Sequence, residues 1–193
     1  MRIAPKSYRT IWRSEDGQSV QIIDQTLLPH TFKIQKLTTV EDTAKAIQTM
    51  QVRGAPLIGV TAAYGLALAM HADPTDQSLK KAVHYLGLQR PTAVNLRWAL
   101  EYMSSALLKV SQSERSTFAF READRLAEND ILSCKSIGEH GLKIIRQIAE
   151  KKKRDTPVQI LTHCNAGKLA CIEWGTATSP IYHGYDAGVP LHV

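Results

Sequence analysis

Apolar and polar residues alternate in two short runs near the N-terminus, residues 8–13 and 19–24. A period of two is typical of β-strands with one buried face. The Glu-Asp-Gly sequence at residues 15–17, between the runs, has the composition of a glycine turn. Residues 31–35 form a third run that would join this hairpin. The pattern therefore predicts a small antiparallel sheet that ends at Lys36.

A helical spacing replaces the alternation directly after this sheet. Thr38 and Glu41 lie three positions apart in a capping-box pattern, with Thr38 as the N-cap residue. Apolar residues then recur at intervals of three and four positions: Val40, Ala44, Ile47 and Met50. This spacing places them on one face and predicts an amphipathic helix.

The most apolar stretch of the chain follows Pro56 and reads LIGVTAAYGLALAM over residues 57–70. A helix that is apolar nearly all round belongs in a core, where Gly59 and Gly65 would let neighbouring helices approach closely. The uncharged stretch is shorter than the ~20 residues that cross a bilayer. We therefore expect a buried central helix and no membrane span.

Further helices are predicted beyond the central one. The Asp-Pro pair at residues 73–74 would end the central helix, and Pro91 is well placed to open the next. A longer helical pattern covers residues 118–153. Gly138 and Gly141 interrupt it, and we expect the helix to loosen near them.

The pattern changes again after residue 157. Residues 158–163 (VQILTH) form a short apolar run, residues 165–167 (NAG) form a glycine turn, and helical residues follow from Lys168 onward. This order is typical of the first strand, turn and helix of a parallel sheet. Residues 189–193 would begin the next strand.

These patterns predict an α/β chain in two parts. Residues 1–154 would form the small sheet and a helical domain, and residues 155–193 the start of a parallel-sheet domain. A buried parallel sheet needs several strands with both faces covered. We therefore expect the second domain to be truncated.

Composition is that of an ordinary globular protein, with 193 residues, 44% hydrophobic and 22% charged. The net charge of +6 and the isoelectric point near 9.3 suit an anionic partner, either nucleic acid or a phosphorylated metabolite. Charge alone does not choose between them. The first ten residues lack the apolar run of a secretory signal, so we expect a cytoplasmic protein.

Cysteine usage argues against two common kinds of site. Cys134, Cys164 and Cys171 are odd in number and form no CxxC pair, which argues against a disulfide framework and against a zinc site. We expect reduced thiols, no metal and no cofactor. Cys134 and Cys171 fall in predicted helices and are interpreted as packing residues.

The strongest chemical pattern is THCNAG at residues 162–167, where a predicted strand ends and a predicted helix begins. Ligands of open α/β sheets bind at that edge, and the positive end of a helix favours the reactive thiolate form of a cysteine. Cys164 is therefore a candidate reactive residue, with burial as a small apolar side chain as the alternative. Strand alternation would turn His163 to the opposite face.

Two further patterns suit an anion. In the RGAP turn at residues 53–56, proline opens a helix, glycine lets a ligand approach the backbone, and arginine offers a fork for phosphate. Arg90 stands in the same way ahead of another predicted helix. For each motif alone, an ordinary turn that carries an exposed arginine is the commoner outcome.

Several stretches, taken together and in order, resemble the methylthioribose-1-phosphate isomerases: VRGAPLIGVTAAYGLAL, RPTAVNLRWAL, IGEHG and ILTHCNAG. The resemblance covers almost the whole chain. It implies a small N-terminal sheet with a helical domain, followed by a Rossmann-like domain, with the active site between them. Enzymes of this family convert an aldose phosphate to a ketose phosphate in methionine salvage.

The resemblance also implies roles for particular residues. Arg53, Gly54, Ala55 and Arg90 would hold the substrate phosphate, and Cys164 would be the catalytic cysteine. The family's other catalytic group is an aspartate in the later part of the Rossmann-like domain, which has no counterpart here. We therefore expect no appreciable isomerase activity from this chain alone.

Two alternatives come from the wider superfamily: ribose-1,5-bisphosphate isomerase, and a non-catalytic regulatory subunit like those of the translation-initiation guanine-nucleotide exchange factor. The intact RGAP, RPTAVN and HCNAG set favours the enzyme lineage. The expected partner is a small-molecule sugar phosphate, with no nucleic acid or membrane, and the full-length protein is expected to be a homodimer. Lys168, Cys171 and Glu173 depart from the small or apolar residues usual at their positions.

Overall fold

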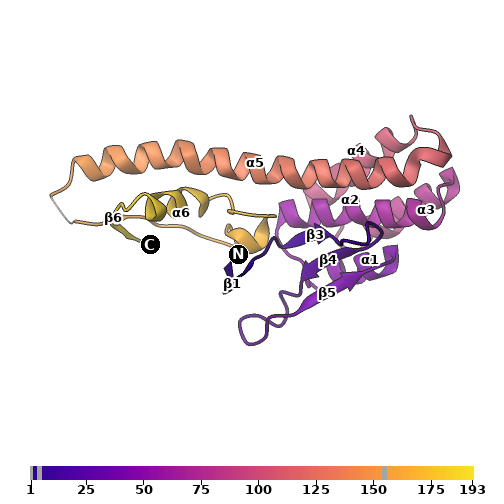
Figure 1. Ribbon diagram of the computed structural model, residues 1–193, viewed down its shortest axis with the longest axis horizontal. Coiled ribbons are helices and arrows are strands. Elements are labelled where there is room, and N and C mark those ends of the chain that lie inside the picture. The colour runs from indigo at the N-terminus through magenta and orange to yellow at the C-terminus, as the bar shows by residue number, and fades with distance from the viewer. Residues whose placement is uncertain (1, 4–5, 154–155) are drawn as a thin grey trace.

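The computed structural model describes residues 2–3, 6–153 and 156–193. A single long helix, α5 (Arg115–Glu150), runs along one side of the molecule (Figure 1). The N-terminal sheet and the helical cluster lie against one half of α5, and the C-terminal elements lie against the other half. The predicted fold class is confirmed. The predicted domain boundary, at residues 154–155, lies outside the described residues.

The N-terminal strands form two antiparallel sheets. Strand β1 (Arg2–Ile3) pairs with β2 (Lys6–Ser7), and β3 (Ile11–Arg13), β4 (Val20–Ile23) and β5 (Ile34–Leu37) pair in that order. The predicted hairpin and third strand are thus present, and the last strand ends one residue later than expected. One face of the larger sheet is buried in the core, through Ile11, Val20, Ile22 and Leu37.

Helix α1 (Val40–Gln48) begins one residue later than the sequence pattern predicts. Its capping box joins Thr39 and Asp42, so the expected pairing of Thr38 with Glu41 is wrong. The Asp42 N–H donates to Thr39 Oγ1 over 3.0 Å, and the Thr38 and Thr39 N–H groups donate to Asp42 Oδ2. Partial burial raises the pKa of Asp42, but hydrogen bonds from both threonines outweigh it and lower this pKa below its usual value.

Helix α2 (Ala55–Ala72) is the centre of the helical cluster. By length and composition it could cross a membrane, yet 78% of it is buried inside the molecule, as expected for a core helix. Helices α1, α3 (Asp76–Gly87), α4 (Val94–Leu107) and α5 pack around it.

Helix α4 starts three residues after Pro91, not at that proline. The Ala93 N–H donates to the Arg90 carbonyl over 2.9 Å and closes a turn. Pro91 occupies the second position of this turn, which its fixed φ favours. The proline therefore shapes the approach to the helix.

Helix α5 follows a short 3₁₀ turn, η1 (Gln112–Glu114), and continues without a break through both glycines that were expected to loosen it. Tertiary packing explains their presence. A Cβ atom on Gly138 would lie 2.3 Å from Nδ1 of His183, and one on Gly141 would lie 2.4 Å from Cγ of Pro180. The two glycines let α6 (Ser179–Asp186) pack closely against α5.

The C-terminal elements differ from the predicted strand-turn-helix order. Strand β6 (Val158–Gln159) pairs in parallel with β7 (Leu191–His192), which confirms a parallel arrangement but with a shorter first strand. The expected helix from Lys168 is wrong. Only the 3₁₀ turn η2 (Lys168–Ala170) forms there, because the chain turns sharply at Trp174 and Gly175, both of which have positive φ.

Tertiary hydrogen bonds hold residues 168–172 in place of helical ones. The Thr10 N–H donates to the Ile172 carbonyl over 3.2 Å, and the Ile172 N–H donates to Asp130 Oδ2 over 2.9 Å. Gln25 Nε2 donates to another carbonyl of the segment over 2.7 Å. Since buried backbone groups must find partners, these three contacts fix the segment between the sheet and α5.

Gly54 provides the space for this docking. It precedes α2 with a φ of +112°, and a Cβ atom at this position would lie 2.4 Å from Cα of Ala170. A larger residue would therefore suffer both backbone strain and a collision with backbone.

The capping box of α1 can be tested by comparing Asp42→Ala with Glu41→Ala. We expect Asp42→Ala to lower the free energy of unfolding by about 1 kcal/mol and Glu41→Ala by only about 0.3 kcal/mol, because only Asp42 closes the box. Urea denaturation at neutral pH measures both. An equal loss in the two variants would instead support the Thr38–Glu41 pairing.

The hydrogen bonds to the Asp42 carboxylate also predict that the stability of the protein depends on pH. The folded state lowers the pKa of Asp42, so its stabilisation is present above the unfolded value of about 3.9 and is lost as pH falls through the folded value. The deficit of Asp42→Ala should therefore shrink when urea denaturation is repeated below about pH 4. A deficit that stays constant into strong acid would contradict the hydrogen bonds to the carboxylate.

Substitution of Gly54 tests the docking of residues 168–172. We expect Gly54→Ala to cost more than about 2 kcal/mol and to speed amide exchange at Ile172, because the new Cβ displaces Ala170. Gly188 is the matched control, since it also has positive φ (+72°) but a Cβ there would meet nothing within 4 Å. Gly188→Ala should cost about 1 kcal/mol and leave exchange at Ile172 unchanged. If both variants lost the same stability and exchanged equally at Ile172, the backbone strain of a positive φ would be the whole effect, without a collision with Ala170.

Candidate active site

The RGAP turn places two exposed residues at the beginning of α2. Arg53 is exposed, Gly54 is the N-cap residue, and Ala55 begins the helix with an exposed side chain. Within the described part of the chain, no side chain caps this helix, and its first turn carries no acidic residue. Its first backbone N–H groups therefore keep their hydrogen-bonding capacity and their partial positive charge.

Helix α4 shares this property, whereas α1 and α3 do not. Its N-cap residue is Ala93, and among the described residues none caps the helix through a side chain. In contrast, Thr39 caps α1 and Thr75 caps α3, and acidic residues occupy the first turns of both. The helices that follow Arg53 and Arg90 are thus both uncapped, as are α5 and α6 among the described elements.

The first turn of α4 lies against the second turn of α2. A Cβ atom on Gly59 would lie 3.1 Å from the Asn95 carbonyl oxygen, so the two helices touch through this glycine. The RGAP and RPTAVN motifs therefore meet in space. Two uncapped helix termini with an arginine ahead of each form a suitable environment for a phosphate group.

Cys164 lies in an exposed loop and not at the start of a helix. Residues 160–167, all of them described, form neither helix nor strand, so the expected effect of a helix dipole on this thiol is wrong. His163 is exposed as well, and strand alternation does not separate the two side chains. Cys164 has a φ of +69°, a left-handed conformation that costs a residue with a Cβ about 1 kcal/mol.

The docking of residues 168–172 places the segment that follows the cysteine loop on the RGAP turn. Ala170, six residues after Cys164, packs directly on Gly54. Gly54 and Ala170 thus form a junction between the RGAP turn and the segment that follows the cysteine loop. Arg90 lies beside a separate cavity of about 240 Å³, which is lined by residues of α3 and α4.

A cavity of about 330 Å³ opens beside this junction, between α2, α4 and α5. Pro56, Gly59 and Asn95 contribute to its wall from the two motifs. Arg125 also lines it, but its guanidinium donates to Glu122 over 2.9 Å, so that its charge is neutralised. Arg125 is therefore a poor candidate for binding an anion.

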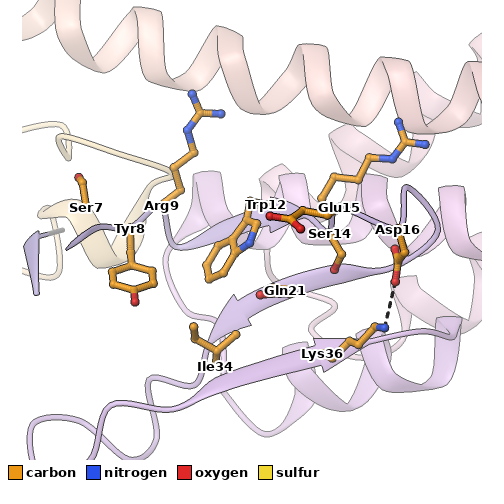
Figure 2. A pocket seen from close by; sticks show the side chains of 11 residues that line it. Ser7, Tyr8, Arg9, Trp12, Ser14, Glu15, Asp16, Gln21, Ile34 and Lys36 are labelled. Atoms are coloured by element: carbon orange, nitrogen blue, oxygen red, sulfur yellow. Dashed lines mark hydrogen bonds and ion pairs between the residues drawn. The ribbon is translucent and has the colours of Figure 1, made fainter. Parts of the chain in front are cut away.

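A larger cavity of about 690 Å³ lies on the outer side of the N-terminal sheet, lined by Tyr8, Trp12 and several charged residues (Figure 2). Its cations are paired: Lys36 with Asp16, Arg9 with Glu128 and Arg13 with Asp124. None of the predicted site residues lines it. Its position and its compensated charges separate it from the RGAP and RPTAVN motifs.

Sequence reasoning missed a cluster formed by Asp130, Cys134 and Cys171, whose oxygen and sulfur atoms lie within 4.8 Å of one another. The Cys171 thiol donates a hydrogen bond that lowers the pKa of Cys134, although burial opposes it. The same hydrogen bond, together with burial, raises the pKa of Cys171, and burial raises the pKa of Asp130. The spacing of four between Asp130 and Cys134 was visible in the sequence, but the approach of Cys171 was not.

Solved structures share this fold along almost the whole chain. The 5-methylthioribose 1-phosphate isomerase of Pyrococcus horikoshii aligns with a TM-score of 0.81 and 35% identity over 96% of this chain and 51% of that one. The delta subunit of translation initiation factor eIF-2B from A. fulgidus aligns with a TM-score of 0.81 and 36% identity, over 97% of this chain and 54% of that one.

Curated relatives are still more similar in sequence. The methylthioribose-1-phosphate isomerases of Methylorubrum extorquens and Escherichia coli O45:K1 are 54% and 52% identical over all 193 residues, which correspond to 52% of each relative's length. The chain thus spans about half the length of the curated relatives it matches. Residues 51–193, which contain the RGAP turn, α4, α5 and the cysteine loop, match the Initiation factor 2 subunit family, and the chain belongs to that family.

Proposed function

We propose that this chain is part of a methylthioribose-1-phosphate isomerase of methionine salvage, which converts 5-methylthioribose-1-phosphate to 5-methylthioribulose-1-phosphate. The observation that carries the proposal is the meeting of two uncapped helix termini, α2 and α4, each preceded by an arginine. The names of the relatives at 52% to 54% identity support the same activity.

In this proposal the junction at the start of α2 holds the substrate phosphate. Arg53 and Arg90 supply charge, and the backbone N–H groups at Gly54 and Ala55 supply fixed donors. Binding of the ground state does not by itself accelerate a reaction. Its contribution is to orient the sugar, so that the reacting carbons lie next to the catalytic groups.

The chemistry requires an acid because the anomeric carbon carries the phosphate and the sugar ring cannot open freely. Protonation of the ring oxygen would open the ring, and hydrogen would then move from carbon 2 to carbon 1 while the carbonyl forms at carbon 2. The family resemblance assigns the acid to an aspartate in a later part of the Rossmann-like domain. Cys164 would assist the hydrogen transfer or stabilise its transition state, in an exposed loop that a second domain can cover.

The regulatory-subunit alternative shares the fold, since the eIF-2B delta subunit has the same TM-score as the isomerase. The motifs at the junction favour the enzyme, because Arg53, Arg90 and Cys164 together suit a sugar phosphate and a reaction on it. We accordingly propose a sugar phosphate as partner, a homodimer for the full-length protein, and the cytoplasm as its location.

The proposal is tested by joining this chain to the C-terminal half of the Methylorubrum extorquens isomerase and measuring conversion of the substrate by NMR. We expect turnover from the joined protein and none from the 193 residues alone, because general acid-base groups contribute about 10² to 10⁴-fold each. Turnover by the chain alone at the rate of a full-length relative would place the acid within these residues and contradict the assignment.

Substitutions in the joined protein separate binding from chemistry. Arg53→Ala should lower kcat/KM by about 10 to 100-fold, mainly through KM, because it removes charged hydrogen bonds to phosphate. Cys164→Ser should lower kcat by about 10²-fold or more with little change in KM. Arg146→Ala, an exposed arginine on α5 far along the helix, is the matched control and should change neither. Unchanged kinetics in the first two variants would contradict the roles of Arg53 and Cys164, whereas absence of turnover in the joined protein would favour the regulatory alternative.

A further inference from the structure

Two thiols and a carboxylate converge beneath the junction, from positions far apart in the sequence. Asp130 and Cys134 are four residues apart on α5 and so lie on one face of the helix, one turn apart. Cys171 reaches them from the segment that follows η2. The cysteines are 2% and 1% exposed, so the thiols face the interior.

The surrounding hydrogen bonds hold these donors in position. The Ile172 N–H donates to Asp130 Oδ2 over 2.9 Å, which orients the carboxylate. Thr10 Oγ1 donates to the Cys171 carbonyl over 2.5 Å, and the Thr10 N–H donates to the Ile172 carbonyl. Such outer contacts are the kind that orient metal ligands in proteins.

Asp130 also lacks a compensating charge. In the part of the chain that the structure describes, no basic side chain pairs with it, and the Ile172 N–H is its hydrogen-bond donor. A partly buried carboxylate without a cation is costly. A bound cation at the cluster would supply the missing positive charge.

We propose that Asp130, Cys134 and Cys171 bind a borderline-soft divalent cation of the Zn²⁺ type. Thiolate and carboxylate are ligands that zinc accepts, at about 2.3 Å for sulfur and about 2.0 to 2.2 Å for oxygen. In a tetrahedral zinc site, these bond lengths put the two sulfur atoms about 3.8 Å apart. In the structure, the ligand atoms of the three residues already lie within 4.8 Å of one another. On binding, each thiol releases its proton to solvent.

A fourth ligand and an entry path are available from the neighbouring cavity. Asp130 lines the cavity of about 330 Å³ between α2, α4 and α5, through which water can reach the carboxylate. Three protein ligands with water in the fourth position form a common zinc geometry. The bound ion would tie α5 to the segment that packs on Gly54, and so would stabilise the junction.

Cobalt and zinc titrations test the site in the reduced chain. We expect one Co²⁺ per chain, a thiolate-to-cobalt charge-transfer band, and displacement of that ion by Zn²⁺. Cys171→Ser and Asp130→Asn should each weaken Zn²⁺ binding by at least about 10 to 100-fold in calorimetry. Circular dichroism of each variant checks that it folds, and Asp130→Asn, nearly equal in shape, keeps the test valid if Cys171→Ser unfolds.

Cys164→Ser is the matched control, because it removes the exposed thiol and leaves the buried ones. It should bind Zn²⁺ as tightly as the parent chain. Absence of a charge-transfer band would overturn the proposal, as would loss of binding in Cys164→Ser. Formation of a Cys134–Cys171 disulfide in air, seen as the loss of two hydrogens in the intact mass, without metal uptake by the reduced chain would also overturn it.

Discussion

The close approach of Gly54 to Ala170 is the contact on which the arrangement of the site depends. A Cβ atom in this position would lie 2.4 Å from the backbone of Ala170, so only glycine lets residues 168–172 cross the start of α2. Hydrogen bonds from Thr10 and Gln25 to that segment, and from the Ile172 N–H to Asp130, then hold it in place. The RGAP turn, the cysteine loop and the buried thiols owe their proximity to this crossing.

Helix α5 supports both halves of the molecule. In its N-terminal half, Glu128 pairs with Arg9 and Asp124 pairs with Arg13, both from the N-terminal region of the chain. Farther along, Gly138 and Gly141 let α6 pack closely, and Asp130 holds the docked segment between these two regions. One rigid element thereby sets the distance between the helical cluster and the parallel strands.

The helix termini differ in how their first N–H groups are satisfied. Helices α1 and α3 satisfy their first N–H groups with threonine side chains and carry acidic residues there. In α2 and α4, as in α5 and α6, no described side chain caps the first turn, and an arginine precedes each of α2 and α4. An isomerase and an initiation-factor subunit share this fold, so the fold alone does not distinguish the two functions.

By itself, the sequence determined the small sheet, the buried central helix and the parallel arrangement of the last strands, because these depend on local spacing and composition. It also identified Arg53, Arg90 and Cys164 as candidates, since their motifs are local. Only the tertiary structure decided that the region after Lys168 is not a helix, because its backbone groups bond to the sheet and to α5. The same is true of the thiol cluster: Cys134 and Cys171 meet through a crossing of chain segments, which no short-range pattern encodes.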